Sequence, residues 1–185
     1  NESDKEKYTI KELVSVFDSS GIQKSGARFD IKKATWVNHL HVQECSPKKI
    51  IETAGDQILG LTSLFGDKKT EEIISLIKDR VNILSDIKKE TKMFLAAPSD
   101  YDAKTLQKLN NGEGLIVLNF CNLEIASSKK GVAIKEGVFN ASAKNNISFG
   151  QTMETLRLAL VGSLRGPDLF RTIEIIGADE ATKRI

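Results

Sequence analysis

The chain has 185 residues, of which 40% are hydrophobic and 28% are charged, so it can bury a sizeable core. Its formal net charge of +2 is too small to indicate a nucleic-acid partner by itself. No apolar run approaches the roughly 20 residues of a membrane span, and the first residues do not have the pattern of a signal peptide. Cys45 and Cys121 lack neighbours at metal-ligand spacing, so we expect two reduced thiols, no metal site and a cytoplasmic protein.

Helix-capping residues mark the starts of successive helices in the first half of the chain. A side chain that can accept from the first turn precedes each apolar pattern, and a capping box begins the first of them. These signals predict helices after Thr9, after Asp30, over 47–61 behind Ser46 and over 71–94 behind Thr70, with a loop at 66–69. The break at Ala97-Pro98-Ser99-Asp100 follows, and we place a subdomain boundary between residues 97 and 98.

The second half of the chain is also predicted to be helical. The apolar density at 115–127 fits either a strand or a buried helix, and we choose helix because no alternating partner strand lies nearby. We expect a turn at 110–114 and a weak helix over 132–144 that Gly137 interrupts. Further helices are expected over 102–109, 151–161 and 167–176 and after Gly177. The fold class is therefore all-α, in two helical subdomains, 1–97 and 98–185.

Arg80 interrupts the apolar stripe of the helix predicted over 71–94. At about 100° per residue it falls among the residues that should face the core, Ile73, Ile77, Leu84 and Ile87. An unpaired buried guanidinium is costly, so Arg80 must either pair with a carboxylate or face an anionic partner through a gap in the core. Asp79 and Glu72 are the nearby carboxylates, although neither lies on the same helix face.

Arg157 raises the same question in the helix predicted over 151–161, where apolar residues surround it. A structural ion pair is one explanation, with Glu154 nearby in sequence, and an outward-facing cation is the other. Arg165 stands just before Gly166-Pro167-Asp168, where a new helix begins and its unbonded N–H groups favour an anion or another acceptor.

Two arginines in different halves of the chain thus break the same patterning rule, as functional residues often do. Arginine suits bidentate recognition of a base edge or a phosphate, and single-stranded RNA loops are read through such contacts. The alternative is an all-α protein-interaction module with internally paired arginines and no RNA role. An independent enzyme finds no support, because the sequence lacks a nucleophile–base pair, a metal-spaced ligand set and a phosphate-binding glycine loop.

Two blocks of the sequence carry patterns of a known family. One is "LRLALVGSLRGPDLFRTIEIIGADEATKRI" at 156–185, and the other is "YTIKELVSVFDSSGIQKSGARFDIKKATWVNHLHV" at 8–42. The second block places family residues at Lys24, Ser25, Ala27, Phe29, Asp30, Lys33, Trp36 and Asn38. With "YDAKTL" at 101–106, these blocks resemble the C-terminal end of bacterial glutamyl-tRNA synthetases in order and spacing. The stretch from about 110 to 145 matches only in length and helicity.

The resemblance implies a two-part helical cage that holds the anticodon of a glutamate tRNA. It aligns Arg80 with the arginine that reads the last anticodon base, and Arg157 with the arginine that contacts the middle of the anticodon. Lys33 and Trp36 align with positions near the inner corner and the anticodon stem. Where the family contacts the first anticodon base, from the loop before the last helix, this chain has Gly166 and Leu169, and Gly166 offers only its backbone. Arg165, just before them, is a further candidate for anticodon binding.

The family's reaction joins glutamate to tRNA with ATP and Mg²⁺ in a catalytic domain that carries two ATP motifs. Neither motif occurs in these 185 residues. The resemblance therefore implies an anticodon-binding region with no active site, cofactor or metal of its own. It also implies a cytoplasmic monomer whose partner is tRNA, without membrane contact.

Overall fold

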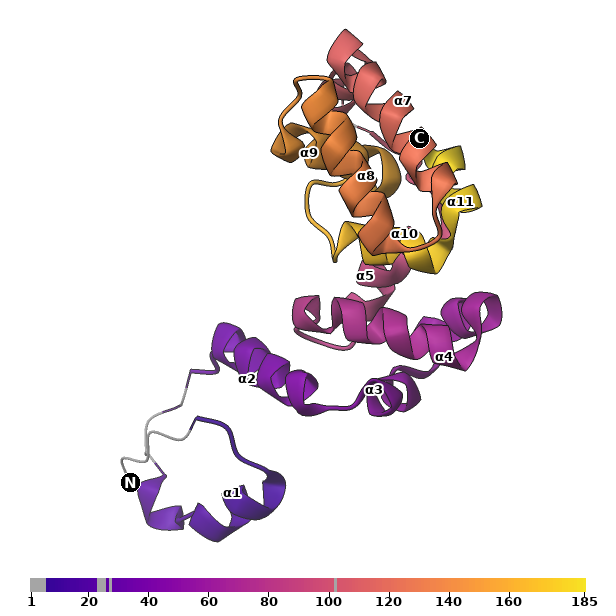
Figure 1. Cartoon of the computed structure of the whole chain (residues 1–185). Coiled ribbons are helices and arrows are strands. Elements are labelled where there is room, and N and C mark those ends of the chain that lie inside the picture. Colours follow the sequence, from indigo (N-terminus) through magenta and orange to yellow (C-terminus); the bar gives the residue numbers. More distant parts are fainter. Residues whose placement is uncertain (1–5, 23–25, 27, 102) are drawn as a thin grey trace.

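The structure is a computed structural model that describes residues 6–22, 26, 28–101 and 103–185 (Figure 1). The first half holds α1 (Ile10–Val16), α2 (Ile31–Glu44), α3 (Pro47–Ala54), α4 (Leu59–Ile77) and α5 (Asp86–Leu95). The second half holds α6 (Ala103–Asn110), α7 (Gly112–Ser127), α8 (Gly131–Lys144), α9 (Phe149–Val161), α10 (Leu169–Ile176) and α11 (Ala178–Arg184). Short 3-10 helices lie between them, η1 (Ser19–Gly21), η2 (Gly55–Ile58) and η3 (Lys78–Arg80). The described residues contain no strand, and the all-α prediction is confirmed. Lys24, Ser25 and Ala27 of the family pattern, and Asp102, lie outside the described residues.

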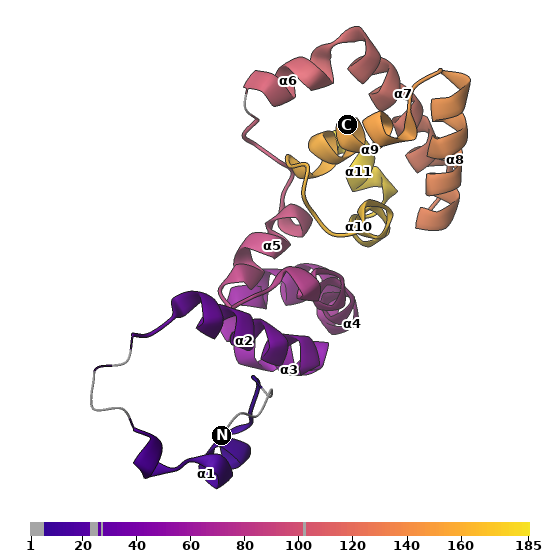
Figure 2. The same ribbon diagram turned by 90° about the vertical axis from the view of Figure 1, so that its left-hand side faces the viewer.

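The molecule is elongated, with α1–α4 in a lower part and α6–α11 in an upper part (Figure 1). Helix α5 rises from the lower part to the upper part, as Figure 2 shows. Each part has its own apolar cluster. The lower cluster includes Leu61 and Ile77 of α4, and the upper one includes Ile125 of α7 and Leu156 of α9. None of the described helices is long and apolar enough to cross a membrane.

The C-terminal helices join the two parts. Ile175 of α10 is buried in the cluster of the lower part, where α10 packs against α5. The side chain of Arg184 in α11 is only 2% exposed, and its Nε pairs with Glu180 at 2.8 Å. Its Nη1 donates to the carbonyl oxygen of Met93 in α5 at 2.6 Å. These contacts fix α5 against the upper part.

Three of the four helix starts predicted in the first half follow their caps. Thr9 and Glu12 form the expected capping box at α1, and the side chain of Asp30 accepts a backbone N–H in the first turn of α2. Ser46 caps α3 in the same way, with proline directly behind it. Each cap provides an acceptor for one of the N–H groups that a helix start leaves unbonded.

The single helix predicted over 71–94 is wrong. Helix α4 ends before η3, a non-helical segment follows, and α5 begins only at Asp86. The Asp86 carboxylate accepts from the backbone N–H groups of Asn82 at 3.0 Å and Ile83 at 3.1 Å. This local turn competes with a continuous helix, and it lets Val81 turn inwards and become buried.

Two glycines in the first half redirect the chain. Gly55, with a φ of 53°, ends the helix predicted over 47–61 and leads into η2. Gly66, with a φ of 72°, is not helical and divides α4 into two helical segments that meet at a kink, so the loop predicted at 66–69 is limited to this glycine. The cap predicted at Thr70 is wrong, because its hydroxyl lies within α4 and donates to the Gly66 carbonyl oxygen at 2.8 Å.

In the second half, the choice of helix for 115–127 is confirmed by α7. The turn predicted at 110–114 is wrong, because Asn111 caps α7 and the next residues form its first turn. Gly137 does not interrupt α8. A Cβ atom there would lie 2.1 Å from Glu124 Oε2, so the glycine leaves room for this side chain of α7.

Candidate nucleic-acid interface

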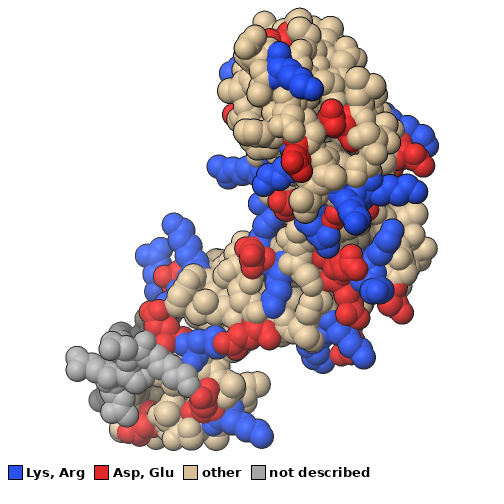
Figure 3. Space-filling view, in the orientation of Figure 1, with Lys and Arg blue, Asp and Glu red and all other residues tan. Residues whose placement is uncertain are grey.

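A cleft of about 430 Å³ opens where the upper and lower parts meet. Its walls come from η3, from α5 and the segment that follows it, and from the loop after α9. The charged residues that line it are Arg80, Lys89, Glu90, Lys92, Asp100 and Arg165. Figure 3 shows Lys and Arg side chains gathered around this junction, with Asp and Glu among them. We call this feature the junction cleft. It combines excess positive charge with a concave shape, as an anionic ligand requires.

Arg80 reaches the junction cleft from η3, not from the buried stripe of a long helix, so that prediction is wrong. Its Nε donates to Glu90 Oε2 at 2.5 Å, and the two side chains are 32% and 11% exposed. The predicted carboxylates, Asp79 and Glu72, are therefore not its partners. No described residue accepts from the terminal amino groups of Arg80, which remain available to an acceptor in the cleft.

Arg157 lies in α9 behind the wall of the junction cleft and does not line it. Its Nη1 donates to the carbonyl oxygen of Pro167 at 2.9 Å, and among the described residues no carboxylate lies within ion-pair distance. Burial lowers the pKa of Arg157, the nearby Asp168 carboxylate raises it, and the charge of Arg80 lowers it. Arginine stays protonated well above neutral pH, so Arg157 carries its charge there.

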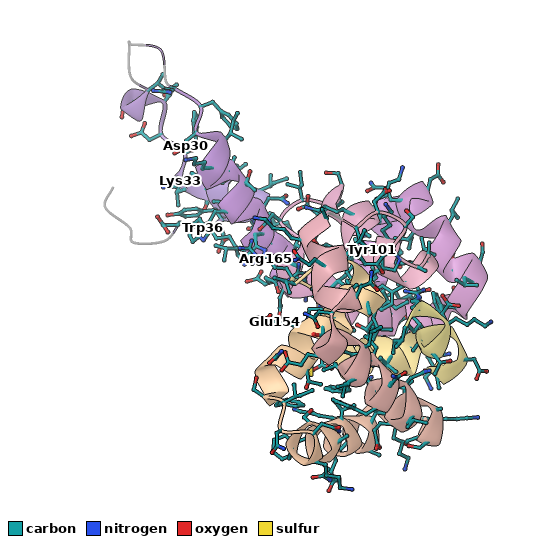
Figure 4. The ribbon with its side chains drawn as sticks, turned by 90° about the horizontal axis from the view of Figure 1, so that it is seen from above. Asp30, Lys33, Trp36, Tyr101, Glu154 and Arg165 are labelled. Carbon is teal, nitrogen blue, oxygen red and sulfur yellow. The ribbon has the colours of Figure 1, made fainter. Side chains whose placement is uncertain are left out.

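The loop over 162–168 shapes the cleft wall next to Arg157. Arg165 is exposed and lines the cleft, on the side of the body from which α2 extends (Figure 4). Gly166 lies directly against Arg157, because a Cβ atom at 166 would be 2.9 Å from Nη1. The side chain of Leu169 is 1% exposed and packs in the upper cluster, so the structure does not bring it to the cleft. Helix α10 begins at Leu169, two residues later than predicted.

Lys33 and Trp36 lie away from the junction cleft, on α2. Figure 4 shows Asp30, Lys33 and Trp36 placed along this helix as it extends from the body. Trp36 is 43% exposed, and Lys33 Nζ lies 3.6 Å from Glu6 Oε1 with both side chains largely in solvent. Their positions form a second exposed surface, separate from the cleft.

Sequence reasoning missed Glu90, which is the partner of Arg80. Positions ten apart on one helix differ by about 80° in direction, so a helical pattern could not pair the two residues. It also missed the contacts by which three polar residues of α2 bond to the segment carrying Arg80. Those contacts join residues 35 to 44 positions apart in sequence, for which no short-range pattern exists.

The described residues hold no cluster of His, Cys, Asp and Glu that could bind a metal ion. Burial raises the pKa of the Cys121 thiol to about 12, and the neighbouring Glu124 adds to the shift, so this thiol is a poor nucleophile. The arrangement therefore supports binding through charge and hydrogen bonds, with donors directed towards acceptors of a ligand.

The comparisons of this chain with known proteins agree with one another. The family model described as an anticodon binding domain matches residues 46–185. The glutamate–tRNA ligases of Flavobacterium johnsoniae and Porphyromonas gingivalis are each 31% identical to this chain, over 99% of it and 37% of their own length. The crystal structure of a glutamate tRNA ligase from Elizabethkingia meningosepticum matches with a TM-score of 0.84 at 31% identity, covering 96% of this chain and 36% of that one. The chain thus spans little more than a third of these relatives.

Proposed function

Because this chain belongs to the anticodon-binding domain family, we propose that it holds the anticodon of a tRNA in the junction cleft. The observation that carries the proposal is the pair of cations at this junction. Arg80 presents terminal amino groups there that no described residue accepts from, and Arg157 lies directly behind the cleft-lining loop, against Gly166. Splayed anticodon bases offer the acceptors that these donors lack.

The resemblance suggests how the contacts divide. Arg80 reads the last anticodon base and Arg157 the middle of the anticodon, while the backbone at Gly166 faces the first base. Arg165, exposed beside it, adds a further contact to the anticodon. Lys33 and Trp36 on α2 contact the stem. Leu169 supports the loop from inside, since its side chain is buried. In this proposal residues 1–97 and 98–185 are the two subdomains, and each supplies one of the two reading arginines.

The whole protein, in this proposal, is a glutamate–tRNA ligase that acts as a monomer in the cytoplasm. It joins glutamate to its tRNA with ATP and Mg²⁺, in residues beyond the chain described here. The support is the coverage of the ligases that this chain matches, because the chain accounts for 37% of their length. Its own part in the reaction is to select the tRNA.

Binding of tRNA transcripts to the 185-residue chain tests the proposal. We expect tighter binding to a glutamate tRNA than to the same tRNA with a changed last anticodon base. A bidentate contact is worth about 1–3 kcal/mol, so Arg80→Ala should lower the ratio of the two Kd values about 5- to 100-fold. Arg157→Ala should remove the preference at the middle base. Lys135→Ala, which alters an exposed residue of α8 away from the cleft, is the control. A protein-interaction module would bind all these tRNAs equally.

A further inference from the structure

Helix α2 bonds directly to the segment that carries Arg80. Three of its side chains meet three backbone carbonyl oxygens at residues 78–82. The contacts are Asn38 Nδ2 to Asn82 O at 2.5 Å, His39 Nδ1 to Val81 O at 2.9 Å and Gln43 Nε2 to Lys78 O at 2.8 Å. All three donors come from the second half of α2, beyond Lys33 and Trp36.

The carbonyl oxygens of Val81 and Asn82 lie just beyond η3, while that of Lys78 already accepts from the backbone N–H of Val81 at 3.0 Å. A helix C-terminus leaves its last carbonyl groups without intrahelical N–H donors, and the chain after η3 is not helical. Asn38 and His39 supply donors to the oxygens of Asn82 and Val81, and Gln43 adds a second donor at that of Lys78. A carbonyl oxygen can only accept, so the hydrogen of neutral His39 sits on Nδ1.

These three hydrogen bonds hold α2 in place as well as η3. Val42 is the one buried side chain of this helix, so apolar packing alone holds it weakly to the lower part. On the opposite side, Glu90 of α5 binds Nε of Arg80. Arg80 is therefore held by two elements, since α2 bonds the backbone on either side of it and α5 bonds its side chain.

We propose that Asn38, His39 and Gln43 are positioning residues that set the reading geometry of Arg80, an inference that rests on the proposed function. The same helix that presents Lys33 and Trp36 then places the arginine that reads the last anticodon base. Loss of a donor leaves Arg80 in the chain and the cleft charge unchanged, but lets the backbone of η3 shift. The expected consequence is weaker selection at one base, with tRNA binding otherwise retained.

The test measures the ratio of Kd values for tRNA with a changed and an unchanged last anticodon base. His39→Ala and Gln43→Met remove one donor each, and we expect each to lower this ratio about 2- to 10-fold. His39→Asn places an amide N–H near the position of Nδ1 and should keep the ratio within about twofold of the original. Thr35→Ala is the matched control on α2, since the Thr35 hydroxyl bonds only within its own helix. The same ratio at the middle base should not change in any of these variants.

The Arg80→Ala background separates this inference from the proposed function. There, His39→Ala should cause no further loss of preference at the last base, because the residue being positioned is gone. If Arg80→Ala removes the preference while His39→Ala and Gln43→Met both keep it, the positioning role is overturned and the reading role of Arg80 stands. If Arg80→Ala leaves the preference intact, the proposed reading role fails and the positioning role fails with it. Equal losses at both bases would show a general effect on the fold and would also overturn the positioning role. Should His39→Ala fail to fold, Gln43→Met and His39→Asn decide the outcome.

Discussion

Arg80 is paired and available at the same time. A guanidinium has five N–H donors, and the Glu90 carboxylate takes the one on Nε. A partly exposed ion pair adds little to stability, so the structural effect of Glu90 is mainly to fix the direction of the side chain. The carboxylate also lowers the positive potential of the junction cleft, so anions that fit the cleft poorly bind to it less tightly.

Replacing Glu90 by glutamine separates these two effects. Glu90→Gln keeps the shape but loses the charge, so tRNA with a changed last anticodon base should bind as tightly as before or tighter, while the preference for the unchanged base falls. The free energy of unfolding should fall by about 1 kcal/mol or less. Binding of both tRNAs and a urea titration measure this. Equal weakening of both tRNAs with the preference intact would contradict it.

Gly166 tests the position of Arg157 without removing its charge. Its φ is not in the left-handed region, so alanine suits the backbone, but the new Cβ would lie 2.9 Å from Arg157 Nη1. The flexible guanidinium should move, and the fold should not. We therefore expect Gly166→Ala to reduce the preference at the middle anticodon base, while the free energy of unfolding changes by about 0.5 kcal/mol or less. A large loss of stability, or an unchanged preference, would refute this account.

At the scale of the elements, capping residues allowed most helices to be predicted. Thr9, Asp30 and Ser46 act through backbone groups two or three residues away, so the sequence contains the whole interaction. The break between α4 and α5 could not be predicted in this way. Apolar spacing continues through it, whereas three of its stabilising donors come from α2, far away in the sequence.

The same limit applies to the candidate site. Hydrophobic patterning correctly identified Arg157 as a cation within an apolar helix, and that helix is α9. It selected Arg80 through a helix that does not exist, although the residue does line the cleft. A lone arginine in an apolar pattern thus indicates a charge placed among apolar residues. The residue that pairs with it depends on tertiary contacts, which the spacing of residues in the sequence cannot predict.

The end of α9 offers a stability test with an internal control. Gly162 has a φ of 71°, and a Cβ there would lie 2.8 Å from the Pro98 ring, which cannot move aside easily. Gly162→Ala should therefore lower the free energy of unfolding by about 1–2 kcal/mol or more. Gly150→Ala, in the first turn of the same helix and with open space around it, should be neutral or stabilising. Urea titrations of both variants measure the contrast, and similar losses at the two positions would contradict it.

Over the whole molecule, the positions of the charged side chains matter more for binding an anionic ligand than the net charge does. A net charge of +2 gives no reason to expect an RNA ligand, yet Lys and Arg gather at the junction of the two parts (Figure 3). The fold produces this concentration by bringing α5 next to the loop over 162–168, and the buried Arg184 helps to hold that arrangement. Composition could not reveal it, because the contributing residues come from both halves of the chain.

The salt dependence of tRNA binding measures this arrangement. Lys89 and Lys92 are exposed and line the junction cleft, where they can neutralise phosphates and release their counterions. Each of Lys89→Ala and Lys92→Ala should reduce the slope of log Kd against log salt concentration by about 0.7–0.9, with the preference among anticodon bases unchanged. Lys135→Ala changes net charge by the same amount on α8, outside the cleft, and should leave the slope as it is. An equal reduction of the slope in all three variants would contradict this prediction. Binding would then depend on the overall charge of the protein, because Lys135→Ala removes no contact in the junction cleft.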